Sequence, residues 1–350
     1  MTVNTPHKPS VSAAPTGGTS RRRVLTILAG AAGTAGILAL GKAGWGQASP
    51  PSLLEWRGVA LGAEGRIVIA GRGRAEARAL IARVQAEIAR LDAIFSLHRS
   101  QSELVRLNRD GRLAAPSSDL VALLSLSRRV SELSAGAFDP TVQPLWRLYA
   151  DHFARVHADP AGPSRGAIAR ARAHVDYARV AVAPTEIRFT RPAMAITLNG
   201  IAQGYIADRI ADLLRGEGLT NVLVTLGEVR AIGGHPSGRG WRIAVPDPDD
   251  RGRQLETLAI RDQAVATSAG AGSRFSGATR FHHLFDPATG LSARRNRSVT
   301  VIADRAAIAD GLSTALYVMA PERAGKLLAA FPDTRALLFD ASGRRHDFPA

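Results

Sequence analysis

The chain has 350 residues, a hydrophobic fraction of 45% and a formal net charge of +15, so it can bury a sizeable core and is neither fibrous nor disordered. Only Lys8, Lys42 and Lys326 are lysines; the arginines are scattered rather than grouped in a block, so no nucleic-acid partner is expected. The absence of cysteine excludes disulfides, thiolate metal sites, a cysteine nucleophile and a lipid-anchored N-terminus, and any metal must bind oxygen or nitrogen.

The N-terminal segment is typical of an export signal. A basic stretch, S-R-R-R-V-L (Ser20–Leu25), leads into an apolar run rich in alanine and glycine that ends at Leu40, and a small-x-small site ends at Ala48. Paired arginines after a serine favour the twin-arginine route, with the periplasm as destination. An uncleaved membrane anchor is the alternative. We expect a signal peptide at 1–48 and a mature domain at 49–350 that is soluble or peripheral to the inner membrane.

The mature chain mixes amphipathic helices with short strands. Its first half predicts a strand at Ile67–Ile69, a helix at Ala75–Leu91, a helix at Leu120–Leu133 capped by Ser118 or Asp119, and a loop with a short helix at Ala150–Arg172. A hairpin over Val180–Leu198, with its last strand at Ala195–Leu198, precedes a helix at Gly204–Leu214. There follow strands at Val222–Leu226, Trp241–Val245, Leu258–Ile260 and Val299–Ile302, helices at Ala306–Met319 and Glu322–Ala330, and a strand at Ala336–Phe339. This order favours an α+β architecture over a regular βαβ repeat.

The segment A-D-G-L-S-T (Ala309–Thr314) lies near the start of a predicted helix. It places Asp310 and Thr314 four residues apart, so both side chains share one helix face. A carboxylate and a hydroxyl one turn apart can supply two oxygen ligands to Mg²⁺. An aspartate near a helix start is also a common cap, and the spacing alone leaves both interpretations open.

The segment H-H-L-F-D-P-A-T-G (His282–Gly290) has the composition of a compact turn. Such a turn could direct His283 into a cleft while Asp286 organises the loop, and an imidazole there could take a proton from an attacking hydroxyl. A histidine on the surface without a chemical role is the alternative.

The segment L-N-G-I-A-Q-G-Y (Leu198–Tyr205) joins a predicted strand to a predicted helix. Glycines such as Gly200 and Gly204 let the backbone approach a ligand closely, and a helix N-terminus favours a phosphate. A plain connection between the two elements would have the same composition.

The segment S-A-G-A-F-D-P-T-V (Ser134–Val142) follows the second long predicted helix and presents Phe138 beside Asp139. An aromatic ring next to a carboxylate could contact a nucleobase or a flavin. The same two side chains could instead pack and cap.

Taken together and in order, these segments resemble the ApbE-like family, the FAD:protein FMN transferases. The resemblance runs from about Leu61 to Phe339. It also includes the segments L-D-A-I-F-S-L-H-R-S-Q-S-E-L-V-R-L-N (Leu91–Asn108), T-L-G-E-V-R-A-I-G (Thr225–Gly233), A-V-A-T-S (Ala264–Ser268) and S-V-T-V-I-A (Ser298–Ala303). It implies an α+β fold of mixed sheets with flanking helices and a nucleotide cleft between two lobes.

The resemblance further implies a chemistry. In the family, Mg²⁺ is held by a backbone carbonyl, an aspartate and a threonine, and the matching positions are Gly200, Asp310 and Thr314. The family reaction transfers FMN from FAD to a threonine hydroxyl of a membrane or periplasmic redox subunit and releases AMP, and the metal neutralises pyrophosphate charge. His283 matches the family's H-x-x-D-P position. Together with Asp310 it is the expected catalytic residue, activating the acceptor hydroxyl or assisting the phosphates.

Positions expected to contact FAD also follow from the resemblance. They are Leu61, His98, Ala137, Phe138, Asp139, Thr197, Gln203 and His283. The chain departs from the family pattern at several of them. Where the family has M-G-T, this chain has L-G-A, which starts at Leu61. Where the family has Tyr, Asp and Lys, this chain has His98, Thr197 and Gln203, respectively. Ala269 lies in T-S-A-G where the family has T-S-G-D. Because the departures concern the flavin side, hydrolysis of FAD to FMN and AMP, or FAD binding in the periplasm without catalysis, are the alternative functions.

Overall fold

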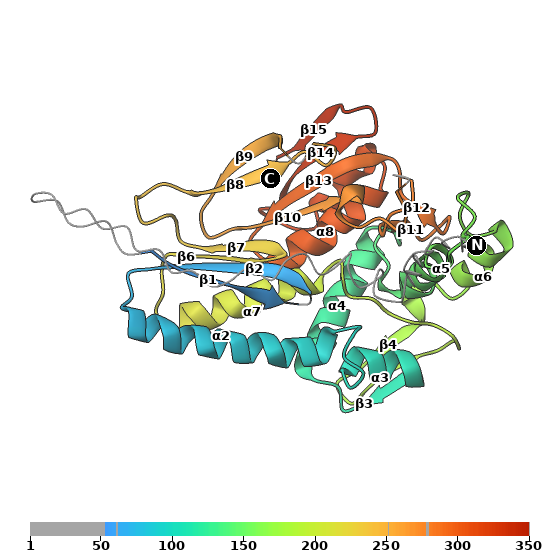
Figure 1. The fold of residues 1–350 in the computed structure, drawn as a ribbon, viewed down its shortest axis with the longest axis horizontal. Coiled ribbons are helices and arrows are strands. Elements are labelled where there is room, and N and C mark those ends of the chain that lie inside the picture. The colour runs from blue at the N-terminus through green and yellow to red at the C-terminus, as the bar shows by residue number, and fades with distance from the viewer. Residues whose placement is uncertain (1–52, 61, 251, 278–279, 350) are drawn as a thin grey trace, which may run out of the picture.

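An eight-stranded antiparallel sheet organises this computed structural model, which describes residues 53–60, 62–250, 252–277 and 280–349 (Figure 1). The strands are, in spatial order, β1 (Leu53–Ala60), β2 (Ala63–Ala70), β6 (Val222–Leu226), β7 (Glu228–Ile232), β10 (Ala264–Ala269), β13 (Asn296–Ala303), β14 (Arg335–Asp340) and β15 (Arg345–Phe348). The first and last strands of the described chain therefore form the two edges. The predicted α+β fold class is confirmed. The predicted signal peptide at 1–48, and Leu61, lie outside the described residues.

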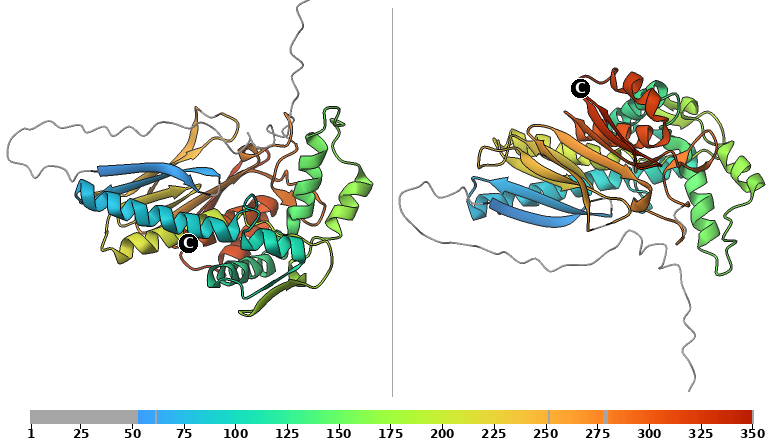
Figure 2. Two further views of the ribbon diagram at one scale, coloured as in Figure 1. Left: turned by 60° about the horizontal axis from the view of Figure 1, so that its bottom comes forward. Right: turned by 90° about the horizontal axis from the view of Figure 1, so that it is seen from above.

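Different layers cover the two faces of this sheet (Figure 2). Side chains alternate between the faces along each strand, so Ile67 packs toward the helices whereas Val68 packs on the opposite side. The helical layer contains α2 (Arg74–Phe95), α7 (Ala202–Gly216) and α8 (Ala306–Val318). The other face is covered by the hairpin of β8 (Trp241–Pro246) and β9 (Gln254–Ile260), whose residues Trp241 and Ile260 pack on it. In the described part, no helix is long and apolar enough to cross a membrane.

Most of the remaining elements lie on the side of the molecule where α2 ends, as Figure 1 shows. They are α3 (Glu103–Asp110), α4 (Ser118–Leu133), the 3-10 helix η1 (Pro140–Val142), α5 (Gln143–Phe153), α6 (Arg165–Arg172), the strands β3 (Arg112–Ala114), β4 (Val180–Val182) and β5 (Glu186–Phe189), and the hairpin of β11 (Phe285–Asp286) and β12 (Leu291–Ser292). An aromatic cluster attaches this hairpin to α5, since the ring of Tyr149 lies 5.0 Å from that of Phe285 and 6.1 Å from that of Phe281. The two phenylalanines flank the histidine pair and so fix the position of that turn.

The predicted cap of α4 is wrong by one residue. The hydroxyl of Ser117 accepts the backbone N–H of Leu120 at 3.2 Å, whereas Ser118 and Asp119 already belong to the helix. Asp119 is instead directed toward other helices, where Arg90 and a tyrosine donate to its carboxylate.

The predicted strand Ala195–Leu198 is also wrong, because the structure assigns no strand to this segment. The side chain of Asn108 bonds both backbone groups of Ile196, and the N–H of Thr197 donates to the Pro140 carbonyl at 2.8 Å. A side chain therefore satisfies backbone groups that a neighbouring strand would otherwise pair.

Two further expectations need adjustment. The region Ala150–Arg172 contains the end of α5 as well as the expected short helix, α6. The predicted helix at Glu322–Ala330 is divided into the 3-10 helix η4 (Pro321–Arg323) and α9 (Ala324–Leu328). Each of the other predicted helices and strands overlaps an observed element of the same type.

Candidate functional site

The starts of α7 and α8 cap each other at the centre of the molecule. The carboxylate of Asp208 on α7 accepts the N–H groups of Ala306 and Ala307, at 2.9 and 3.0 Å, at the start of α8. In return, Asp310 on α8 accepts the N–H of Gly204 through Oδ2 at 3.1 Å, in the first turn of α7. Since the first N–H groups of a helix have no partner within it, this exchange gives acceptors to three of them and joins the two helix starts.

Close approach of the two helices depends on glycine. A Cβ atom at Gly204 would lie 2.3 Å from the carbonyl oxygen of Ala306, a separation that no side chain tolerates. Asp310 thus acts as a helix cap, as one of the two interpretations expected, but it caps α7 and not α8, the helix to which it belongs.

The predicted metal-binding residues meet beside this helix contact. Gly200 lies just before α7, and a Cβ atom there would be 2.9 Å from Oγ1 of Thr314 on α8. Thr314 lies one turn after Asp310, and its hydroxyl is 3.4 Å from Oγ of Ser268 at the end of β10. The ring of Phe138 packs against the same side of Gly200, with Cε2 at 3.5 Å from the Cβ position. Residues more than a hundred positions apart in the chain thus converge.

This group fits a divalent cation. Asp310 is only 4% exposed, and burial, reinforced by the nearby charge of Asp208, raises the pKa of its carboxyl to about 7. The Gly204 N–H donates to Oδ2 of Asp310. Among the described residues, no hydrogen bond reaches Oδ1, which leaves that oxygen available to a cation. The Asp310 carboxylate, the Thr314 hydroxyl and a backbone carbonyl such as that of Gly200 are all oxygen donors, the type of ligand that Mg²⁺ prefers. A buried carboxylate without a compensating cation is unfavourable, and a bound metal would remove that cost.

Glu228 is a second carboxylate at this place that the sequence did not single out. It is the first residue of β7, and burial raises its pKa well above the ordinary value, an effect that the charge of Asp310 increases. The preceding Gly227 has a φ of +86°, and a Cβ atom there would lie 2.6 Å from the Gln203 side chain, so Gln203 covers this turn. The sequence does contain a signal for this residue, since Glu228 directly follows a glycine turn between two largely buried strands.

The two neighbouring histidines differ in what their rings can do. Nδ1 of His283 donates to the Ser273 carbonyl at 3.0 Å, and burial lowers its pKa, so the ring is neutral and Nε2 carries a lone pair. In His282, by contrast, Nε2 donates to the Ala293 carbonyl at 2.8 Å and Nδ1 accepts the Leu284 N–H. His283 is therefore the ring that has a nitrogen available to accept a proton.

The A-F-D segment is used mainly within the fold. Oδ1 of Asp139 accepts the backbone N–H and the hydroxyl of Thr141, at 2.7 and 2.6 Å, and Oδ2 accepts the N–H of Tyr177 at 3.1 Å. Burial raises the pKa of Asp139 to about 6. Ala137 is half-buried against the main core, and Phe138 is buried beside Gly200. This geometry matches the packing and capping alternative for Asp139, while Phe138 borders the metal-binding residues.

Two other positions expected to contact the flavin, His98 and Thr197, make local contacts within the fold. His98 is exposed in the loop after α2, and its neighbour Arg99 lines a cavity of about 370 Å³ between β1 and α2. Ala60 and Gly62 line the same cavity. Within the described ranges, no hydrogen bond or ion pair connects His98 with the metal-binding group. Thr197 is half-buried, and its hydroxyl accepts the Asn199 N–H at 3.3 Å.

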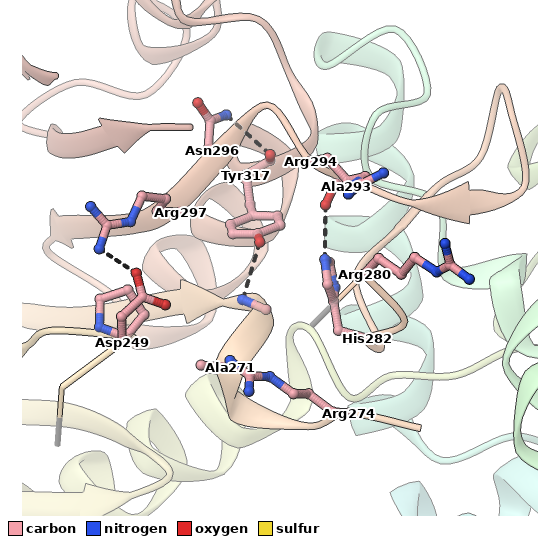
Figure 3. A pocket seen from close by; sticks show the side chains of 12 residues that line it. Asp249, Ala271, Arg274, Arg280, His282, Ala293, Arg294, Asn296, Arg297 and Tyr317 are labelled. Atoms are coloured by element: carbon pink, nitrogen blue, oxygen red, sulfur yellow. Dashed lines mark hydrogen bonds and ion pairs between the residues drawn. The ribbon is translucent and has the colours of Figure 1, made fainter. Parts of the chain in front are cut away.

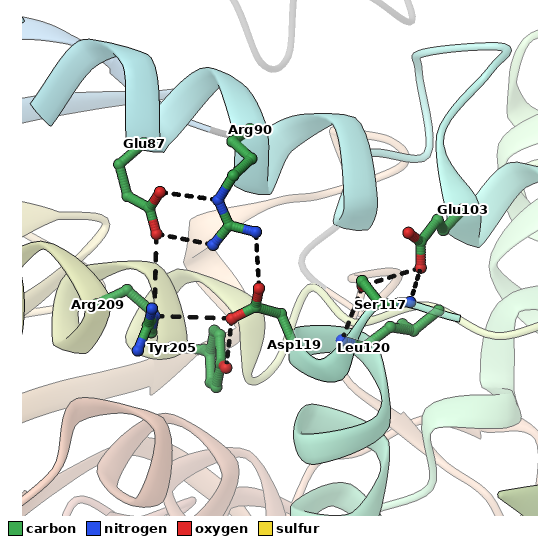
Figure 4. Close-up of polar contacts among 8 residues, drawn as sticks. All are labelled: Glu87, Arg90, Glu103, Ser117, Asp119, Leu120, Tyr205 and Arg209. Carbon is green, nitrogen blue, oxygen red and sulfur yellow. Dashed lines mark hydrogen bonds and ion pairs between the residues drawn. The ribbon is translucent and has the colours of Figure 1, made fainter. Parts of the chain in front are cut away.

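A polar network behind the site holds the start of α7 in place (Figure 4). The hydroxyl of Tyr205, one residue after Gly204, donates to Asp119 on α4 at 2.8 Å. Arg90 of α2 donates to the same carboxylate at 2.7 Å and to Glu87 at 2.8 Å. Burial and the adjacent Asp119 raise the pKa of Tyr205, so it remains a hydrogen-bond donor. Three helices are thereby joined next to the candidate metal site.

Comparison with known proteins places this geometry in a family, since residues 61–338 match the family model described as "ApbE family". The chain belongs to the ApbE family. An FAD:protein FMN transferase of Klebsiella pneumoniae is 32% identical over 291 residues, which are 80% of this chain and 82% of the relative. The corresponding protein of Treponema pallidum is 31% identical and aligns over 77% of this chain and 79% of its own length.

Solved structures of the ApbE family agree with this assignment. The flavin transferase ApbE of Vibrio cholerae superimposes with a TM-score of 0.75 and 27% identity, covering 86% of this chain and 98% of its own. The ApbE protein of Thermotoga maritima gives a TM-score of 0.75 and 30% identity, covering 85% and 97%. The predicted α+β fold is thus confirmed, and the chain is an enzyme, a flavin transferase of the ApbE family.

Proposed function

We propose that this ApbE-family enzyme transfers FMN from FAD to a threonine hydroxyl of an acceptor protein, depends on Mg²⁺ and releases AMP. FAD as donor and a protein as acceptor are supported by the name that the curated relatives share, FAD:protein FMN transferase. The observation that carries the metal-dependent mechanism is the convergence of Gly200, Asp310 and Thr314 beside the start of α7.

Bound Mg²⁺ would be held by the Gly200 carbonyl, the Asp310 carboxylate and the Thr314 hydroxyl, and it would neutralise charge on the pyrophosphate of FAD. The positive end of α7, which begins next to Gly200, favours the same phosphates. The acceptor oxygen forms a bond to the phosphorus of FMN, and the bond from that phosphorus to the bridging oxygen breaks, so AMP leaves. Nε2 of His283 takes the hydroxyl proton, while the Ser273 carbonyl holds Nδ1–H and stabilises the charged ring.

A turnover assay with FAD tests this proposal, with and without Mg²⁺ and with and without a candidate redox subunit. Mass spectrometry of the subunit should detect an FMN adduct only when Mg²⁺ is present. His283→Gln should slow transfer by roughly 10²–10⁴-fold, the usual contribution of a general base, and should retain FAD binding. His157→Gln, which alters an exposed histidine, is the control. AMP release without an acceptor would favour FAD hydrolysis, and tight FAD retention without turnover, unaffected by Asp310→Ala, would favour a non-catalytic binding protein.

We also propose that the enzyme acts in the periplasm after export by the twin-arginine route, and that its acceptors are periplasmic or membrane redox subunits. The S-R-R-R-V-L segment and the apolar run that follows support this location. Replacing Arg21 and Arg22 with lysine should leave the protein in the cytoplasm, as measured by cell fractionation. Unchanged export of this variant would contradict the twin-arginine route.

A further inference from the structure

A cavity of about 200 Å³ behind the histidine turn carries an excess of positive charge (Figure 3). Four arginines line it, and we call it the arginine pocket: Arg274 and Arg280 come from the loop after β10, and Arg294 and Arg297 from the segment that enters β13. The acidic residue among its lining residues is Asp249.

Two of the four arginines are already engaged within the fold. Arg297 pairs with Asp249, as the dashed line in Figure 3 marks, so that acid is not available to the others. Arg280 donates to the Pro160 carbonyl at 2.8 Å and lies over the ring of Phe281 at 4.7 Å. Arg280 keeps its charge, but its guanidinium is already held by neutral groups, so Arg274 and Arg294 are the two arginines of the pocket whose guanidinium groups are not held within the described fold.

Arg274 and Arg294 have no acidic partner among the described residues. Nε of Arg274 is buried and makes no hydrogen bond there, although buried polar groups in folded proteins nearly always have partners. The charges of both arginines act on His282, whose pKa is lowered to about 4 by burial first and by neighbouring positive charges in addition. His282 is consequently neutral and adds no further positive charge to the pocket. The pocket therefore has one acid, Asp249, which is paired with Arg297, and the charges of its other three arginines have no acidic partner among the described residues.

The arginine pocket lies directly beside the candidate active site. Tyr317, which lines the pocket, is on α8 one turn after Thr314, and its hydroxyl accepts the N–H of Gly270 at 3.1 Å. Gly270 lies two residues after Ser268, whose hydroxyl contacts Thr314. His282 lines the pocket, whereas its neighbour His283 is the proposed base. The ring centroids of His282 and His283 are 6.4 Å apart, so an anion in the pocket would lie close to the group that receives the acceptor proton.

We propose that the arginine pocket binds an acidic side chain of the acceptor protein and so positions the acceptor next to His283. This inference rests on the proposed transfer to a protein. A cavity of this volume admits a carboxylate side chain but is smaller than the sites of about 300–1,000 Å³ that enclose whole ligands. The proposed function places the phosphates of FAD at the Mg²⁺ site around Gly200, so they do not compete for the same arginines. Guanidinium groups bind carboxylates through two parallel hydrogen bonds, which adds orientation to affinity.

Binding of a short fluorescein-labelled peptide, in which aspartates flank one threonine, tests the proposal by fluorescence anisotropy without any need for turnover. The purified full-length protein should bind this peptide about tenfold more tightly than the same peptide with asparagines, since one charged hydrogen-bonded contact contributes on that order. The double variant Arg274→Gln/Arg294→Gln should lose the preference, and Arg274→Lys should retain part of it. Arg295→Gln, which removes an adjacent exposed arginine outside the pocket, should change binding less than twofold.

Each opposing result has a definite meaning. Equal binding of the two peptides by the wild-type protein, or an unchanged preference in a folded double variant, overturns the proposal. Competition by inorganic phosphate without binding of the acidic peptide, or a large loss of FAD affinity in the double variant, would assign the pocket to a phosphate and also overturns it. Failure of the wild-type protein to transfer FMN refutes the proposed function instead, because the peptide measurement does not depend on transfer.

Discussion

Replacing Asp310 with asparagine should stabilise the metal-free protein while removing a ligand from the proposed Mg²⁺ site. Burial, with the charge of Asp208 in addition, raises the pKa of Asp310 from 3.8 to about 7. The shift is about three pKa units, and each unit corresponds to about 1.4 kcal/mol. Above pH 7 the ionised carboxylate therefore reduces the free energy of unfolding by about 4 kcal/mol. Asparagine avoids this loss, and its oxygen can still accept the Gly204 N–H.

The sign of the pH dependence follows from the direction of this shift. Between about pH 4 and pH 7 the folded protein keeps a proton on Asp310 that the unfolded chain has lost. The wild-type protein should consequently lose stability relative to the asparagine variant as the pH rises through this range, and the two should converge below about pH 4. Mg²⁺ binds the ionised carboxylate, so its affinity for the wild-type protein should increase over the same range and level off above pH 7.

Urea unfolding in EDTA at pH 5 and pH 8 measures the effect. The variant should be more stable than the wild type by about 2 kcal/mol at pH 5 and about 4 kcal/mol at pH 8, and added Mg²⁺ should stabilise only the wild type. Asp151→Asn, which neutralises an exposed aspartate of α5, should show neither effect. If Asp310→Asn is less stable than the wild type at pH 8 without metal, the carboxylate is not a destabilising charge and the reasoning fails.

Two further predictions concern the start of α7. Gly204→Ala should lower the free energy of unfolding by about 2–4 kcal/mol, because its Cβ would lie 2.3 Å from a backbone oxygen. Gly216→Ala, near the end of the same helix with nothing within 4 Å of the Cβ position, should raise it by up to about 1 kcal/mol; equal thermal shifts in the two variants would contradict this contrast. Tyr205→Phe removes the hydrogen bond to Asp119 but keeps the ring contact with Phe95, and it should cost about 1–2 kcal/mol in urea unfolding. A change below about 0.5 kcal/mol would show that the network does not stabilise the fold.

Most elements of the fold could be predicted because their apolar residues repeat with the period of a helix or a strand. The strand β7 was missed since it contains Arg230, a charged residue that is only 4% exposed. Its charge is tolerated there because Asp208 of α7 lies 3.4 Å away, a partner that the local sequence does not reveal. At Ala195–Leu198 the sequence instead predicted a strand that is not formed. The cause is similar, since the side chain of Asn108, far away in the chain, makes the backbone hydrogen bonds of Ile196 that a neighbouring strand would otherwise make.

The candidate site was predictable in part for the same physical reason. Asp310 and Thr314 share a helix face, which spacing alone indicates. Spacing could not indicate that Asp310 caps α7, or that its charge raises the pKa of Glu228. Both effects depend on residues of α7 and β7, which are far from Asp310 in the sequence. The difference between His282 and His283 likewise depends on which carbonyl each ring meets.

The mutual capping of α7 and α8 has a consequence for the newly made chain. The contact between Gly204 and Asp310 spans 106 positions, and β13 of the central sheet lies between them in the sequence. A ribosome-bound chain that has not yet released α8 lacks both the cap of α7 and two of the proposed metal ligands. Such long-range contacts form late because the intervening chain must first be ordered. The oxygen cluster therefore comes into existence only when synthesis of the domain is nearly complete, and metal binding would report that folding has finished.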